Sequence, residues 1–302
     1  MTPIMTRHSL LWAAILVGWM GASPALAQPS EPPKRLLVLT HASLYQHPSL
    51  GPAEQAVIEW GEDGGYEATG LGGYRQDRER LRLSMIDADY LRQFDGVLMF
   101  TNGNLPMNDG QRRALTEFVR DGGGVVGVHS ASLTFYDYPE FGEMLGGYFR
   151  RAVRQEHIFV LRVEDENHPA TRMLGSSWPI VDELYHFGAR AWTDDAPEEG
   201  RDELFGNPIP VAFSRERVHV LLSIDTGRTA LAGLEDAEVV AGGDYPQAWC
   251  RSYGRGRSFY TSLGHRSDLW NGDRVFRAHL LGGIRWALGL DAGDCTPGGD
   301  SH

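Results

Sequence analysis

The chain has 302 residues, of which 42% are hydrophobic and 23% are charged, and its formal net charge at pH 7 is −12. This acidic balance disfavours nucleic acid or an anionic membrane surface as a partner. The apolar content is sufficient for a full hydrophobic core. Only two cysteines are present, Cys250 and Cys295, so a cysteine-based zinc knuckle is excluded.

Residues 1–27 have the pattern of a secretory signal peptide. Arg7 comes before an apolar core that ends at Met20, and small residues up to Ala27 suit cleavage. The core is too short to span a bilayer comfortably. We therefore expect cleavage near Ala27, export to the periplasm or beyond without a retained membrane span, and a short polar leader over residues 28–33.

From residue 34 onward, strand patterns alternate with helix patterns. The apolar runs predict strands over 35–40, 66–71 and 95–101 and a strand ending at His129, with helices over 51–60, 86–94 and 108–120. Asn108 or Asp109 suits the N-cap of the last helix, and Gly122 follows its end. Because the glycines at 122–124 follow a helix, they indicate a helix stop and not a phosphate-binding loop. The alternation predicts a doubly wound, mainly parallel sheet with helices on both faces.

After residue 150 the pattern becomes richer in strands. Predicted strands cover 157–163, 180–187, 209–213, 218–224, 247–253 and 257–263. Gly254-Arg255-Gly256 indicates a hairpin turn between the last two. A helix is predicted over 273–290, and residues 291–302 have the composition of a flexible tail. We expect one α/β domain over 34–290, a flavodoxin-like core with an added strand-rich region at about 150–245. The sequence leaves open whether Cys250 and Cys295 form a disulfide.

His129 is the most informative candidate residue. The valines at 125, 126 and 128 form a run suited to a strand buried on both faces, and this run ends on an imidazole. Doubly wound proteins bind their ligands at the carboxyl ends of such strands. The ends of the first and fourth strands share one edge, so His41 or His47 can face His129. For His168, which precedes a proline, a structural turn is the favoured interpretation.

The segment 256–265 also ends on a histidine, His265. Two imidazoles delivered by two strand ends suit an acid–base pair or half of a metal site. Nothing in the spacing requires a cofactor, but if a divalent metal binds, the first candidate ligands are His129, His47, Glu183 and His265.

Two neighbouring carboxylates, Asp182 and Glu183, are candidates for the same site. In an extended segment they point to opposite faces, so they cannot form a dyad. Glu183 shares a face with Tyr185 and is the preferred site carboxylate, whereas Asp182 is expected to brace backbone or a helix end. A register shift of one residue would exchange the two.

Two tryptophans and a serine complete the set of candidates. Trp249 and Trp270 flank the region of His265, and they suit either a platform for a sugar face or the hydrophobic core. Ser130 has the character of a residue that caps the start of a helix.

Several motifs together resemble those of the ThuA-like (trehalose utilisation) family. They are Gly122-Gly-Gly-Val-Val-Gly-Val-His-Ser-Ala131, Leu145-Gly-Gly147, His168-Pro-Ala-Thr171, Asp182-Glu-Leu-Tyr185, Pro246-Gln-Ala-Trp249 and Gly254-Arg-Gly-Arg-Ser-Phe-Tyr-Thr-Ser-Leu-Gly-His265. The resemblance covers most of residues 34–290. It implies a fold of the class I glutamine amidotransferase-like group, which is a variant of the flavodoxin-like fold.

The same resemblance places His129 where the amidotransferases carry their nucleophilic cysteine, and His265 where their late strand ends on histidine. Ser267 stands in place of the third, acidic member, which argues against glutamine hydrolysis through a thioester. Many relatives carry a histidine where this chain has Arg150 and Arg151, and whether His157 replaces it is open. The resemblance implies carbohydrate metabolism, with disaccharides or their keto derivatives as substrates.

Our hypothesis is an exported enzyme that acts on a sugar, disaccharide or keto-glycoside. The catalytic candidates are His129, His265 and Glu183, and the substrate-binding candidates are His47, Ser130, Asp182, Tyr185, Trp249 and Trp270. Hydrolysis, elimination, hydration and isomerisation all remain open. The alternative is a periplasmic carbohydrate-binding or interaction module that kept the fold without the chemistry. A homo-oligomer is compatible with either.

Overall fold

The structure is a computed structural model that describes residues 1, 32–72, 82–153, 157–188, 208–234 and 239–298. Most of the predicted signal peptide and leader lies outside the described residues. Residues 33–302 form one compact unit. Among the residues that are described, no helix is long and apolar enough to cross a membrane.

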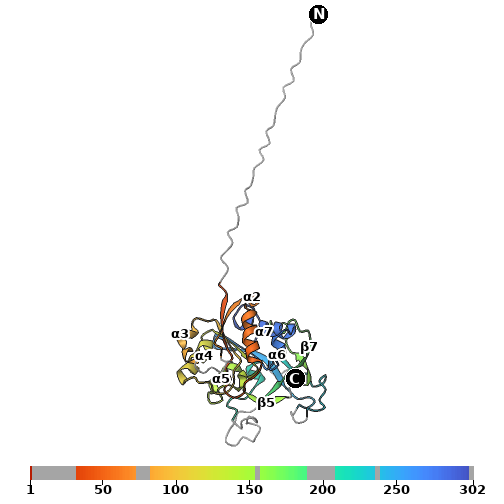
Figure 1. The fold of residues 1–302 in the computed structure, drawn as a ribbon. Coiled ribbons are helices and arrows are strands. Elements are labelled where there is room, and N and C mark those ends of the chain that lie inside the picture. The colour runs from red at the N-terminus through yellow and green to blue at the C-terminus, as the bar shows by residue number, and fades with distance from the viewer. Residues whose placement is uncertain (2–31, 73–81, 154–156, 189–207, 235–238, 299–302) are drawn as a thin grey trace. The chain divides into compact units, whose positions relative to one another are not determined.

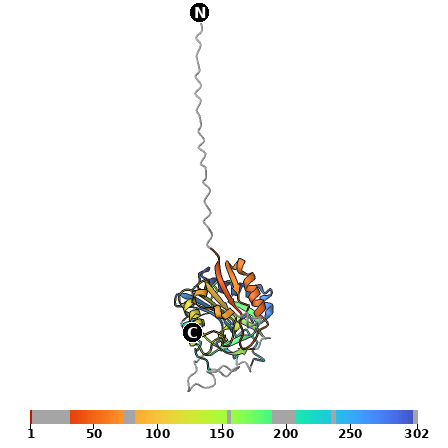
Figure 2. The same cartoon turned by 60° about the vertical axis from the view of Figure 1, so that its left-hand side comes forward.

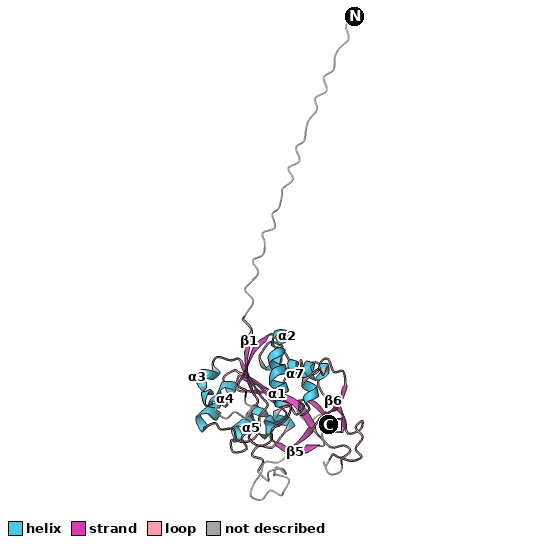
Figure 3. Ribbon diagram, in the orientation of Figure 1, coloured by secondary structure: helices cyan, strands magenta, loops and turns pink. Residues whose placement is uncertain are grey.

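A nine-stranded sheet runs through the domain (Figure 3). In order across the sheet, its strands are β2 (Tyr66–Gly70), β1 (Lys34–Leu39), β3 (Gly96–Met99), β4 (Gly124–Val128), β11 (Gly256–Thr261), β10 (Pro246–Tyr253), β9 (His219–Ile224), β6 (Ile158–Val163) and β7 (Ser177–Val181). The pairings from β2 to β11 are parallel, and those from β11 to β7 are antiparallel. The parallel half has the flavodoxin-like order that the alternating pattern predicted, and the later strands extend it into a mixed sheet.

Helices cover both faces of the parallel half, as predicted (Figures 1 and 2). They are α1 (Leu50–Glu59), α2 (Gly61–Gly64), α3 (Ala88–Leu91), α4 (Asp109–Arg120), α5 (Pro139–Leu145), α6 (Ser267–Trp270) and α7 (Arg274–Ala287). Along β1, Leu36 and Val38 pack into the core cluster shared with α1 and α7, whereas Leu37 and Leu39 pack into the cluster shared with α4 and α5. This alternation is the period of two that a strand buried on both faces requires.

Local sequence signals account for the boundaries of α4 and of the hairpin. Asn108 caps α4 and forms a capping box with Gln111. Gly122, beyond the end of α4, has a φ of +128°, and Gly254 in the β10–β11 turn has a φ of +61°. Both conformations favour glycine, so the predicted helix stop and hairpin are confirmed.

Three predicted elements differ from the structure. The strand predicted over 180–187 is interrupted at Asp182 and Glu183, and the part after them, β8 (Leu184–Phe187), pairs with β5 (Phe149–Val153) in a separate two-stranded sheet. The strand predicted over 209–213 is wrong, because 209–213 is irregular although Ile209 and Val211 are buried. The helix predicted over 86–94 is only α3, preceded by the 3₁₀ turn η2 (Arg82–Met85).

Residues 291–298 do not form the expected free tail. Cys295 forms a disulfide with Cys250 in β10, and the indole of Trp286 in α7 donates to the carbonyl of Gly293. The segment after α7 is therefore fastened to the antiparallel half of the sheet, whereas residues 299–302 lie outside the described residues.

Candidate functional site

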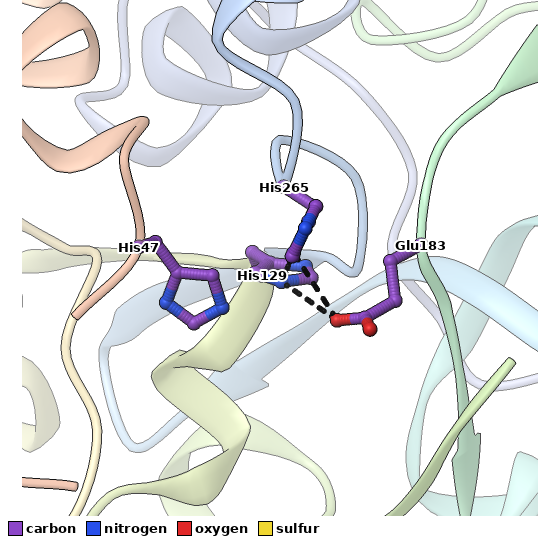
Figure 4. Close-up of side chains that lie close together, drawn as sticks. All are labelled: His47, His129, Glu183 and His265. Carbon is purple, nitrogen blue, oxygen red and sulfur yellow. Dashed lines mark hydrogen bonds and ion pairs between the residues drawn. The ribbon is translucent and has the colours of Figure 1, made fainter. Parts of the chain in front are cut away.

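Four side chains converge beyond the carboxyl ends of the parallel strands (Figure 4). His47 lies in the loop after β1, His129 directly follows β4, His265 follows β11, and Glu183 comes from the break between β7 and β8. Each offers one possible ligand atom, and these atoms all lie within 4.8 Å of one another. The structure therefore brings together the three residues predicted to be catalytic and one of those predicted to bind substrate.

His129 occupies a constrained backbone position. It begins the 3₁₀ helix η3 (His129–Leu133) and has a φ of +48°, in the left-handed region that residues other than glycine seldom adopt. Its side chain is fully buried. Strained residues of this kind concentrate at functional sites, and the nucleophiles of strand-to-helix elbows sit on similar sharp turns. Figure 4 shows the imidazole of His129 between the ring of His47 and the carboxylate of Glu183, close to His265.

The hydrogen bonds of His129 define which ring nitrogen faces the cluster. Nδ1 lies 2.6 Å from the backbone carbonyl oxygen of Ser262, an acceptor, so Nδ1 carries the proton and donates. Nε2 of the neutral ring then holds a lone pair. That lone pair faces the Tyr185 hydroxyl at 2.7 Å and Nδ1 of His265 at 3.2 Å.

Glu183 bridges the two strand-end histidines. Its Oε2 lies 3.5 Å from Nε2 of His129 and 3.2 Å from Nδ1 of His265. Burial alone would raise the pKa of Glu183, but its interactions with the imidazoles of His129 and His265 outweigh burial and lower the pKa to about 2. For His265 burial acts to lower the pKa, and the hydrogen bond and charge of Glu183 raise it above its ordinary value. The side chains of Glu183 and His265 are 21% and 12% exposed, so the cluster is reached through them.

Asp182 has a different role from its neighbour. Its fully buried carboxylate accepts hydrogen bonds from the backbone N–H groups of Gly264 at 2.6 Å and Arg266 at 3.2 Å. Burial is the main reason that the pKa of Asp182 is raised to about 6. Asp182 therefore fixes the backbone on both sides of His265, which is the bracing function that the sequence pattern predicted for one of the two carboxylates.

His47 completes the cluster from the opposite side. Its ring centroid lies 4.8 Å from that of His129 and 5.2 Å from that of His265. Burial, followed by the neighbouring histidines, lowers the pKa of His47 to about 2, so the ring is neutral. The loop that carries it is held by Asn102, whose side chain accepts from the N–H of Tyr45 and donates to the carbonyl of the same residue.

The two predicted aromatic platforms are core residues. Trp249 is 0% exposed and Trp270 is 3% exposed, so neither offers a face to a sugar. Trp270 instead donates from its indole nitrogen to the carbonyl of Gly264 and so supports the loop of His265. Ser130 is also fully buried. It lies inside η3 and does not cap it, and its hydroxyl accepts from Asn102 at 3.4 Å.

The remaining candidate histidines have partners elsewhere. His41 lies 3.3 Å from the hydroxyl of Ser43, and His157 contacts the carbonyl oxygen of Ala230. His168 accepts from the N–H of Ala170, as expected for a structural turn before a proline. None of the three belongs to the described cluster.

Three residues near the site were not among the predicted site residues. Asn102 follows β3 at the same edge of the sheet, which is the signal that could have identified it. Gln247 clamps both backbone polar groups of Tyr185 and also accepts from the hydroxyl of Ser262, so it links the two hydrogen-bond partners of His129. Tyr45 is 52% exposed, and its ring lies 4.7 Å from that of His47. It is therefore an exposed aromatic side chain next to the cluster.

Comparison with known proteins identifies relatives of the chain. A family profile described as ThuA, trehalose utilisation, matches residues 35–215 and 195–287. No curated protein matches the chain.

Solved structures support the same fold. A ThuA-like protein from Bacteroides uniformis ATCC 8492 has 19% sequence identity and a TM-score of 0.61, with 88% of this chain and 95% of that chain covered. A ThuA-like protein from Parabacteroides merdae ATCC 43184 has 20% identity and a TM-score of 0.59, with coverages of 87% and 92%. These likenesses confirm the predicted α/β fold.

Proposed function

The chain belongs to the ThuA family of trehalose utilisation, and on that premise we propose that it is an exported enzyme acting on a disaccharide or its keto derivative at the cluster of His47, His129, Glu183 and His265. The family supports a role in carbohydrate metabolism. The observation that carries the enzymatic part is the convergence of the four groups on one edge of the sheet, around a buried imidazole with a constrained backbone.

The chemistry that suits this arrangement is proton transfer. A keto sugar has acidic C–H bonds next to its carbonyl, and an imidazole can remove such a proton near neutral pH. Nε2 of His129 is the candidate base, because the other ring nitrogen, Nδ1, donates its proton to the carbonyl of Ser262. His265, hydrogen-bonded to Glu183, is the candidate acid. The same pair can protonate a leaving sugar hydroxyl, so elimination and isomerisation are both within its reach.

The proposed sugar platform is Tyr45 in place of the buried tryptophans. Its exposed ring borders His47, and stacking on an aromatic face is a common way to hold a sugar. Replacing Tyr45 by alanine should raise KM with little change in kcat, because stacking binds the substrate and the transition state equally well. A fall in kcat at unchanged KM would contradict this role.

The enzymatic proposal is tested by product formation and hydrogen exchange. The purified chain is incubated in D₂O with trehalose, a β-linked disaccharide and the keto derivatives of both, and proton NMR follows new products and loss of the signal next to the carbonyl. We expect turnover of one substrate class by the wild type and a loss of at least about 100-fold in His265→Gln. The control is His219→Gln, which removes an imidazole paired with Asp165 at 3.0 Å on β9. Binding without product or exchange would instead support the binding module.

Export is part of the proposal. It is supported by the signal-peptide pattern of residues 1–27 and by the Cys250–Cys295 disulfide, because disulfides persist in oxidising compartments. Mass spectrometry of the protein from a periplasmic fraction should give a mature chain that begins near Gln28. An intact N-terminus in the cytoplasmic fraction would contradict export.

A further inference from the structure

We propose that His47, His129, Glu183 and His265 bind one divalent transition-metal ion, with zinc as the representative. The inference concerns the same side chains as the proposed function, but it depends on their geometry alone. An ion on Nε2 of His129 would occupy the lone pair that the proposed base needs, so in the metal-bound protein His129 would hold the ion and would not accept a proton. The metal site would hold whether or not a sugar is the substrate.

The distances among three of the ligand atoms fit a tetrahedral ion. Nδ1 of His265 lies 3.2 Å from both Nε2 of His129 and Oε2 of Glu183, and these last two atoms lie 3.5 Å apart. Ligands at the usual zinc distance of about 2.0–2.1 Å are separated by about 3.3 Å along the edges of a tetrahedron. The three groups are therefore already spaced for a common ion. The ligand atom of His47 lies within 4.8 Å of all of them, and Figure 4 shows its ring turned toward His129.

The hydrogen bonding of His129 is that of a metal ligand. Histidines that bind metals usually donate their outer ring N–H to a carbonyl or carboxylate, which fixes the ring and leaves the other nitrogen free to coordinate. Nδ1 of His129 makes this bond with Ser262, and Gln247 in turn holds the hydroxyl of Ser262. The outer support of the site is thus built into β10 and the residue that follows β11.

The polar atoms crowded around Nε2 of His129 also support its role as a metal ligand. One lone pair faces the hydroxyl of Tyr185, Nδ1 of His265 and Oε2 of Glu183, all within 3.5 Å. A single lone pair serves one good hydrogen bond, so hydrogen bonding alone leaves this crowding unexplained. An ion placed among the two nitrogens and the carboxylate oxygen would account for the short distances among these three atoms.

The donor set indicates which ions bind. Three imidazoles with one carboxylate suit zinc and its neighbours in the transition series. Magnesium prefers oxygen ligands and keeps several waters, so it should bind poorly. The partial exposure of Glu183 and His265 gives an ion a path of entry.

The test measures metal and contains no sugar. Untagged protein is stripped with a chelator, dialysed, and titrated with Zn²⁺, Co²⁺ and Mg²⁺, with stoichiometry from mass spectrometry and affinity from calorimetry. We expect one Zn²⁺ or Co²⁺ per chain, a Co²⁺ absorption spectrum typical of four-coordination, and no comparable Mg²⁺ binding. Glu183→Gln and His265→Gln should each lose more than the ~100-fold in affinity that removal of an outer partner can cause.

Two control variants separate a metal site from general damage to the fold. His219→Gln removes another imidazole paired with a carboxylate, and it should keep one metal per chain. Tyr185→Phe removes the hydroxyl 2.7 Å from Nε2 of His129 without removing a ligand, and it should also keep the metal. Thermal unfolding of the metal-free variants checks that they fold.

Substoichiometric Zn²⁺ and Co²⁺ in the wild type, or unchanged affinity in Glu183→Gln and His265→Gln, would overturn the metal site. Sugar turnover by a protein that binds no metal would refute this inference and leave the proposed function standing. A protein that binds the metal but turns over no sugar would refute the proposed function and leave the metal site standing.

Discussion

Replacing Asp182 by alanine tests how the fold positions His265. The substitution removes the acceptor for two backbone N–H groups, those of Gly264 and Arg266, at a fully buried position. Leaving a buried donor without a partner costs about 1–3 kcal/mol, so the two together predict a loss of about 2–6 kcal/mol in the free energy of unfolding. Burial also makes the ionised carboxylate unfavourable, as its raised pKa of about 6 indicates, and alanine removes that cost. At pH 7.5 we therefore expect the lower part of the range, about 2–3 kcal/mol.

The pH dependence of this loss has a definite sign. Because the pKa of Asp182 is higher in the folded protein than its ordinary 3.8, the folded state binds the extra proton between these values. The stability that this group contributes is fully present below pH 3.8 and is lost as the pH rises through about 6. The difference between wild type and Asp182→Ala should therefore be larger at pH 5 than at pH 7.5.

The assay is urea unfolding followed by tryptophan fluorescence at both pH values. The matched control is Asp268→Ala in α6, the helix that directly follows Arg266; its carboxylate is 65% exposed and pairs with the side chain of Arg266. An exposed pair of this kind contributes less than about 1 kcal/mol. If both variants lose the same stability, or if the loss in Asp182→Ala does not depend on pH, the bracing role of Asp182 is wrong.

Three further predictions concern stability. Replacing Cys250 and Cys295 together by alanine should cost about 2–4 kcal/mol, because the disulfide closes a long loop in the unfolded chain; unfolding in urea with and without reductant measures it, and an effect of reductant on the double variant would contradict the assignment. His279 is fully buried, and burial lowers its pKa from 6.5 to about 4, so its contribution to the free energy of unfolding is present above pH 6.5 and is lost as the pH falls toward 4. The stability difference between wild type and His279→Gln should shrink over that range. A difference that stays constant would contradict this prediction. In Gly254→Ala, the new Cβ would lie 2.4 Å from a backbone carbonyl oxygen of α4, whereas in Gly175→Ala, at nearly the same φ, it meets nothing within 4 Å. Gly254→Ala should therefore lower Tm more than Gly175→Ala. Equal shifts in Tm would show that the backbone conformation alone decides the cost.

Some features of this protein follow from short stretches of sequence. The helix start at Asn108 and the apolar run that ends at His129 depend on neighbours a few residues apart, so they could be predicted and are observed. The order of the parallel strands follows from the alternation of strands and helices, because right-handed crossovers leave few arrangements.

Other features depend on contacts between distant parts of the chain. The break of the strand at Asp182 and Glu183 arises because Asp182 bonds to the loop around His265 while Glu183 turns to the histidines, and neither partner is near in sequence. From the sequence, Trp249 and Trp270 suit a sugar platform as well as the hydrophobic core. Only the packing of β10 and α6 shows that both are buried.

The sequence by itself determined the α/β class, the edge of the sheet where the candidate site lies, and two of its histidines, His129 and His265, because strand ends and imidazoles are local properties. The tertiary structure decided that His47 and not His41 joins the cluster, that Glu183 and not Asp182 faces it, and that the ligand atoms lie within 4.8 Å of one another. These outcomes depend on how loops from four separate strand ends pack together. A difference of a few ångströms in that packing separates a group of surface histidines from a site that can hold an ion.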